Sequence, residues 1–191
     1  EFDLPLEFGC PVSDAEQMNI SGEGLQRLAS ILSESNITAT FFTTSFFADK
    51  NRKLVRDLSE IHEIASHSKC HSEFRDRDII DSKAEIEGIT GRKIHGFRMP
   101  HFKKTDLSFV KAAGYSYDSS INPTLVPGRY NNLSSSRSIY RDISSGLVEV
   151  PVSVSPVIRF PLFWLSFKNI PFSLYLKMCS EAIRKDSYLH L

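Results

Sequence analysis

Residues 62–71 read His-Glu-Ile-Ala-Ser-His-Ser-Lys-Cys-His, which places two histidines directly after a short apolar run. Residues 63–66 have the length and the apolar centre of a buried strand. The spacing of His67 and His71 predicts two imidazoles on one side of a helical turn, where both could reach one metal ion. Histidines at this spacing are more often unrelated surface residues, so the pair needs support from the rest of the chain.

Strand-like and helix-like segments alternate on both sides of this stretch. The expected strands are residues 1–4, 38–42, 63–66, 96–98, 115–120, 147–154 and 187–191. The expected helices are residues 21–35, a segment that begins at Asp49, residues 76–90 before Gly91, and residues 106–113 after a capping Thr105. About seven strands that alternate with helices predict an α/β fold with a mainly parallel sheet. We expect the serine-rich residues 131–146 to form a surface loop.

Composition narrows the classes of function. The 191 residues suit a single domain, and 41% hydrophobic with 24% charged residues is typical of soluble globular proteins. Lys and Arg number 23, as do Asp and Glu, and this balance argues against a nucleic-acid-binding protein and against a polybasic membrane anchor. Prolines and basic residues interrupt the aromatic-rich residues 157–178, so we expect a loop leading into a helix and no membrane span. The strand-like ends suggest that the domain is trimmed on both sides.

A pair of acids at the start of the chain gives a second chemical signal. Glu1 and Asp3 are two residues apart, so on a strand they share a face. At the carboxyl end of a parallel barrel strand they would point into the usual active-site mouth. One carboxylate could then bind a metal while the other acts as general base. The alternative is an exposed acidic strand end.

A third signal is the run from Arg98 to Phe102 at the end of an expected strand. An arginine beside a carboxylate keeps that carboxylate ionised. Pro100 fixes a turn, and the backbone N–H groups that follow it could point at an oxyanion. The alternative is an arginine that pairs with a surface acid.

Taken together, these runs resemble the NodB-type polysaccharide deacetylases, carbohydrate esterase family four. The matching runs are Ala39-Thr40-Phe41-Phe42, the stretch from His62 to His71, Ile89-Thr90-Gly91, Gly96-Phe97-Arg98-x-Pro100 and Ala113-Gly114-Tyr115-x-Tyr117-Asp118-Ser119-Ser120. Their order and spacing agree with the family across about residues 1–123.

The resemblance implies a distorted (β/α) barrel that holds one divalent metal. Zinc is the usual ion, and cobalt or nickel could replace it. The implied metal ligands are Asp3, His67 and His71. Glu1 takes the position of the general base, which in the family is usually Asp, and Arg98 would hold that base.

The resemblance also implies roles for residues further along the chain. Pro100 and His101 would form the oxyanion site through the backbone, with His101 in place of the tyrosine usual in the family. Asp118 falls in the region of the fourth family motif and would be a further catalytic acid, so the Arg98 guanidinium is expected within salt-bridge reach of Glu1 or Asp118. His190 is the only residue here that could be the general-acid histidine of the last strand, unless that histidine lies beyond Leu191.

The activity implied is metal-dependent removal of acetyl groups from an N-acetylated sugar or polysaccharide, so the expected partner is an acetylated glycan or amino sugar. A second reading is a non-catalytic carbohydrate-binding module on a degenerate barrel, because of Glu1 and the uncertain His190. A third reading is a structural metal site, for which Cys70 is the only further ligand candidate. The substrate, the oligomeric state and the compartment, bacterial cytoplasm or cell envelope, are left open.

Overall fold

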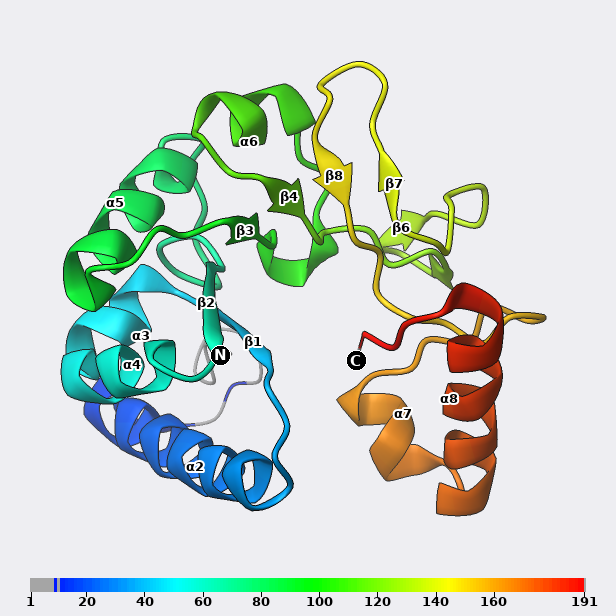
Figure 1. Cartoon of the computed structure of the whole chain (residues 1–191), viewed down its shortest axis with the longest axis horizontal. Helices are drawn as coiled ribbons and strands as arrows, with labels where there is room; N and C mark the ends of the chain where they lie inside the picture. Colours follow the sequence, from blue (N-terminus) through cyan, green and yellow to red (C-terminus); the bar gives the residue numbers. More distant parts are fainter. Residues whose placement is uncertain (1–8, 10, 191) are drawn as a thin grey trace.

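A mostly parallel β-sheet forms the centre of the computed structural model, which describes residue 9 and residues 11–190. The strands follow the order β1-β2-β3-β4-β8-β7 and form an arc around the middle of the molecule (Figure 1). Their bounds are β1 Thr40–Thr43, β2 Glu63–Ser66, β3 Gly96–Phe97, β4 Tyr117–Asp118, β8 Val148–Glu149 and β7 Tyr140–Arg141. All neighbours pair in parallel except β7 and β8, which are antiparallel. The predicted α/β fold is therefore confirmed.

The expected number of parallel strands was too high for the part of the chain that the structure describes. Five strands run parallel there, where about seven were expected. The expected strand at residues 1–4 lies outside the described residues. Residues 187–190 are not a strand, because Ser187 ends the preceding helix in the left-handed region with φ 65°.

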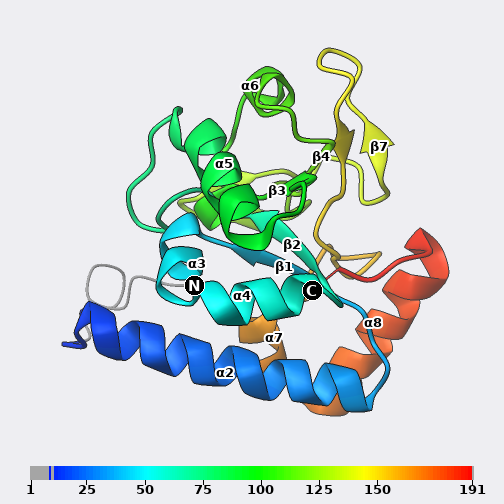
Figure 2. The same cartoon turned by 60° about the vertical axis from the view of Figure 1, so that its left-hand side comes forward.

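Helices cover the outer face of the arc (Figures 1 and 2). They are α2 Asp14–Glu34, α3 Ser45–Lys50, α4 Arg52–Ser59, α5 Asp78–Thr90 and α6 Leu107–Ala112. The main apolar core lies between these helices and the sheet, and it includes Val55, Ile86, Phe97, Val110 and Tyr115. This core fixes the strands whose carboxyl ends carry the residues discussed below.

Local sequence explains most of the helix boundaries. Gly91 ends α5 with φ 71°, as expected from a glycine after the last helical residue. The helix expected after Asp49 is α4, which begins at Arg52. Asp49 is not its cap but lies in α3, and Asn51 separates the two helices with φ −122° and ψ 39°. The cap of α6 is Asp106 and not Thr105, since the Asp106 carboxylate accepts a hydrogen bond from the Ser108 N–H at 2.8 Å.

The second half of the described chain is less regular. The expected surface loop at residues 131–146 contains β7, and a small antiparallel sheet of β5 (Leu125–Val126) and β6 (Tyr130–Asn131) precedes it. The aromatic-rich segment leads into α7 (Trp164–Asn169) and α8 (Phe172–Asp186), as expected. None of the described helices is long and apolar enough to cross a membrane.

Candidate active site

The two histidines of the opening motif lie at the carboxyl end of β2. They do not share a helical turn as predicted, because residues 67–71 form an irregular loop in which Ser68 has a positive φ of 66°. The loop nevertheless brings the imidazoles of His67 and His71 together, with 5.1 Å between their ring centroids. Each residue is only 8% exposed, so both rings are buried in one site.

A backbone contact fixes the orientation of the His67 ring. Its Nδ1 lies 2.8 Å from the carbonyl oxygen of Arg98. A carbonyl can only accept a hydrogen bond, so Nδ1 carries the proton and Nε2 presents its lone pair. Burial, with help from the neighbouring charges of His71 and Arg98, holds the pKa of His67 well below its usual value. The ring is therefore neutral at neutral pH, as a metal ligand must be.

This donor set fits a divalent transition metal in part. Two buried imidazoles, one of them neutral and oriented by a carbonyl acceptor, are typical zinc ligands. The two predicted acids, Asp3 and Glu1, lie outside the described residues. Within residues 11–190 and residue 9, no three His, Cys, Asp or Glu side chains are grouped so that they could hold an ion.

The segment after β3 contributes a third imidazole. Pro100–Phe102 forms a short 3₁₀ turn, in which Pro100 is buried and His101 adopts a left-handed conformation with φ 57°. The His101 ring centroid is 4.3 Å from that of His71. The residue that replaces the family tyrosine therefore places its side chain against a predicted metal ligand.

Arg98 is held inside the arc by contacts on several sides. Its guanidinium donates to the backbone oxygen of Ser119 at 3.1 Å and to the Ser119 hydroxyl at 3.0 Å. It lies over the ring of Phe42, 4.1 Å from the centroid, and at 5.4 Å from that of Phe102. Burial lowers the pKa of Arg98 to about 10, so the side chain keeps its charge at neutral pH.

Asp118 does not have the position expected for a catalytic acid beside Arg98. Adjacent residues of a strand point to opposite faces, and Tyr117 lies across Gly96 inside the arc, so Asp118 faces outward. Its carboxylate accepts from the N–H of Ser120 at 3.0 Å and from the Ser120 hydroxyl at 2.8 Å. No ion pair joins Arg98 to Asp118, both of which the structure describes.

A buried acid that sequence reasoning missed lies beside Asp118. Glu149 pairs with Asp118 across β4 and β8 and has no exposed surface. Burial, followed by the charge of Asp118, raises the pKa of Glu149 to about 10. The sequence signal for Glu149 was a single acid within the apolar run Leu147-Val148-Glu149-Val150. Such a run is typical of a strand that is buried on both faces, so an acid within it is expected to be buried.

The structure brings His190 into the site, although it does so without the expected strand. The His190 N–H donates to the Ser153 hydroxyl at 2.9 Å, and the His190 carbonyl accepts from the Ser153 N–H at 2.8 Å. Its ring stacks on Phe42 at 6.0 Å, and its Nε2 contacts the Arg98 guanidinium. Burial, and then the Arg98 charge, lower the pKa of His190 to about 3. This environment keeps the His190 imidazole neutral, so that its Nε2 accepts a hydrogen bond from Arg98. A general acid, by contrast, must carry a proton that it can donate.

Comparison with known proteins identifies the family. The model of the polysaccharide deacetylase family matches residues 19–118, which is more than half of the chain. The chain belongs to this family. The resemblance read from its motifs is thus confirmed, as is the distorted β/α barrel as the fold of the family. A search of curated protein sequences finds no significant match.

Solved structures of the same fold carry different functions. A crystal structure described as a putative polysaccharide deacetylase from Mycobacterium smegmatis has a TM-score of 0.58 and 24% identity, over 73% of this chain and 50% of that one. Puue allantoinase has a TM-score of 0.65 and 14% identity, over 89% and 57%. A family-four pseudoenzyme from Bacillus anthracis has a TM-score of 0.51 and 18% identity, over 85% and 47%. The chain thus spans about half the length of these proteins, and the shared fold does not choose an activity.

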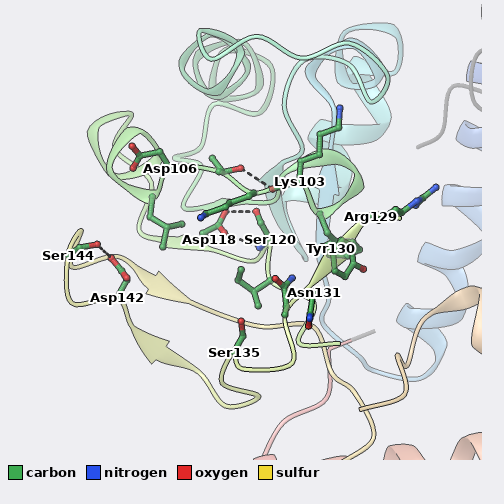
Figure 3. Close-up of a pocket in the computed structure, with 16 residues that line it drawn as sticks. Lys103, Asp106, Asp118, Ser120, Arg129, Tyr130, Asn131, Ser135, Asp142 and Ser144 are labelled. Carbon is green, nitrogen blue, oxygen red and sulfur yellow. Dashed lines mark hydrogen bonds between the residues drawn. The ribbon is translucent and has the colours of Figure 1, made fainter. Parts of the chain in front are cut away.

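A large groove adjoins the site of this family member along the outer face of β4. It encloses about 980 Å³ and is lined by residues from the segments 102–107, 118–121, 129–135 and 142–144. Figure 3 shows Asp142 and Ser144 at one end, and Lys103, Arg129 and Tyr130 toward the other. We call it the β4 groove. Phe102 connects it to the site, because that residue lines the groove and also contacts Arg98.

Proposed function

We propose that residues 1–191 form one domain of a metal-dependent hydrolase that removes the acetyl group from an N-acetylated sugar or polysaccharide. The observation that carries the proposal is the contact of His67 Nδ1 with the Arg98 carbonyl at 2.8 Å. It leaves Nε2 of a buried, neutral imidazole available as a ligand beside a second imidazole.

In the proposed mechanism His67, His71 and Asp3 hold the ion. A bound zinc, cobalt or nickel ion would supply a Lewis acid that polarises the acetyl carbonyl and activates water. Glu1 accepts the proton of the attacking water. The backbone N–H of His101, which follows Pro100, donates to the oxyanion that develops on the acetyl group.

Arg98 acts as a positioning residue in this scheme. Its carbonyl orients His67, while its guanidinium bonds Ser119 and contacts His190. The backbone and the side chain of Arg98 therefore each contact residues of the site. The sugar amine that leaves needs a proton. Burial, and then the Arg98 charge, now keep His190 neutral, so His190 can deliver a proton only if substrate binding changes both.

The alternative is a glycan-binding module without catalysis, and the pseudoenzyme relative shows that the family contains inactive members. Metal content and acetate release separate the two. We expect the wild type to bind one zinc or cobalt ion and to release acetate from tetra-N-acetylchitotetraose, and His67→Ala to lose both. His95→Ala is the matched control, because His95 is an exposed histidine whose Nδ1 contacts only Ser116 at 3.3 Å. Full metal occupancy in His67→Ala would refute the ligand assignment, and glycan binding without acetate release in the metal-loaded wild type would support the module.

A further inference from the structure

Ser119 follows directly after β4, and its side chain faces the inside of the arc. Tyr117 and Ser119 are two residues apart and share a face, whereas Asp118 between them faces outward. Ser119 has no exposed surface, and its N–H donates to the Phe97 carbonyl of β3 at 2.9 Å. The serine beside the predicted acid, and not the acid itself, therefore contacts the site.

The Ser119 hydroxyl has a partner for each of its hydrogen-bonding positions. It donates its only proton to the Val150 carbonyl at 2.7 Å, because a carbonyl can only accept. Two lone pairs are left on the oxygen. One accepts from Nη2 of Arg98 at 3.0 Å, and the other faces Nδ1 of His190 at 3.4 Å. One buried hydroxyl thus joins the ends of β3, β4 and β8 to His190, which the chain brings back toward the middle of the arc after α8 (Figure 1).

Ser119 also fixes the direction of the Arg98 guanidinium. The backbone carbonyl of Ser119 accepts from Nε of Arg98 at 3.1 Å, while the hydroxyl accepts one N–H of Nη2. The other N–H of Nη2 is then directed at Nε2 of His190, with which it is in contact. Two acceptors from a single residue therefore aim Arg98 at the histidine.

Both polar contacts of the His190 ring require the same tautomer. The Ser119 oxygen has no proton left to donate, so Nδ1 of His190 must carry the proton between them. A guanidinium has donors only, so Nε2 presents its lone pair to Arg98. If the ring gains a second proton, Nδ1 keeps its own bond to Ser119. Nε2 is therefore the atom at which the proton comes and goes.

We propose that Ser119 is a positioning residue of the active site, whose hydroxyl holds Arg98 and fixes Nε2 of His190 as the atom that gives a proton to the leaving amine. The ring first takes up its second proton at Nε2 from solvent water. It then gives this proton to the amine nitrogen, which leaves with the electron pair of its bond to the acetyl carbon. The amine takes the place of the Arg98 N–H at Nε2, and Nδ1 stays bonded to Ser119 throughout. The inference rests on the proposed function for the leaving amine, whereas the tautomer can be measured without turnover.

NMR of the histidine ring nitrogens tests the assignment, with the His190 signals identified by their loss in His190→Gln. We expect the wild type to have a protonated Nδ1 and an unprotonated Nε2 at neutral pH. Ser119→Ala removes the acceptor of the Nδ1 proton, so the tautomer protonated at Nε2 should appear. Ser119→Cys should show the same change, because a thiol fills the space of the hydroxyl but forms only weak hydrogen bonds. In both variants kcat on tetra-N-acetylchitotetraose should fall by about 10- to 100-fold while metal content stays at the wild-type level.

The matched control is Ser120→Ala, which removes the next buried hydroxyl of the chain. The Ser120 hydroxyl donates to Asp118 at 2.8 Å and accepts from the Met99 N–H at 2.8 Å, so its loss should leave the His190 nitrogens as in the wild type. A wild-type ring protonated at Nε2 would overturn the inference, as would an unchanged tautomer or an unchanged kcat in both Ser119 variants. Absence of acetate release by the metal-loaded wild type would refute the proposed function, and the ring nitrogens would still decide whether Ser119 fixes the tautomer.

Discussion

Replacing Glu149 by Gln should stabilise the protein at alkaline pH and have little effect at acid pH. The pKa of Glu149 is raised from 4.5 to about 10, first by burial and then by the charge of Asp118. The folded protein therefore keeps a proton that the unfolded chain loses near pH 4.5. The contribution of Glu149 to the free energy of unfolding is greatest below that pH and falls as the pH rises toward 10.

The size of the effect follows from the width of this window. Each pH unit inside it costs about 1.4 kcal/mol of unfolding free energy, because one pKa unit corresponds to 1.36 kcal/mol. Between pH 5 and pH 8 the loss from this one group is about 4 kcal/mol, a large share of the 5–15 kcal/mol typical of a domain. The glutamine of the variant would have no proton to lose, and its amide oxygen could still accept from the Ile121 N–H, which now donates to Glu149 Oε1 at 3.0 Å.

Urea unfolding of both proteins at pH 5, 6.5 and 8 measures the difference. The variant should gain about 4 kcal/mol relative to the wild type between the two extremes. Glu60→Gln is the control, because Glu60 is exposed and pairs with Arg92 on the surface. A difference between Glu149→Gln and the wild type that changes by less than about 1 kcal/mol across this range would show that Glu149 ionises in the folded state like an ordinary acid.

Three further outcomes test the site and the fold. Arg98→Ala should lower kcat by about 10²-fold while cobalt binding, followed by titration and visible absorption, changes much less, because the carbonyl that orients His67 remains; loss of cobalt in this variant would make Arg98 essential to the metal centre itself. His101→Ala should weaken cobalt binding about tenfold while His101→Phe, which keeps a ring against His71, binds nearly as the wild type does; equal affinities for all three would remove His101 from the support of His71. Gly96→Ala should cost about 1–3 kcal/mol in urea unfolding, because a Cβ there would collide with the Tyr117 ring, and the cost should shrink in a Tyr117→Ala background; an undiminished cost would place the strain elsewhere.

Short-range patterns predicted the first half of the fold well. The strand at residues 63–66, the stop of α5 at Gly91 and the parallel order around β2 all depend on neighbours in sequence or on the alternation of strands and helices. The later strands were harder to predict. Residues 187–190 have a strand-like composition, yet Ser187 turns the chain, and His190 then bonds the loop at Ser153.

Site residues that lie close together in the sequence were predicted better than those that only distant strands bring together. His67 and His71 belong to one short loop, so their approach was visible in the spacing even though the helical turn was wrong. Asp118 was identified from a motif, but which face of β4 it occupies depends on Tyr117 crossing Gly96, a contact between two strands. Its partner Glu149 comes from a distant strand, and only the pairing of β4 with β8 joins them.

The segment from Arg98 to His101 explains why a metal site and a substrate site would depend on each other here. Its carbonyl sets the tautomer of His67, its guanidinium contacts His190, and its histidine packs on His71. The next residues, Phe102 and Lys103, already line the β4 groove. The acetylated glycan of the proposed function and the metal would share this segment. Binding of tetra-N-acetylchitotetraose should therefore raise the affinity for cobalt, and by thermodynamic reciprocity cobalt should raise the affinity for the glycan by the same factor.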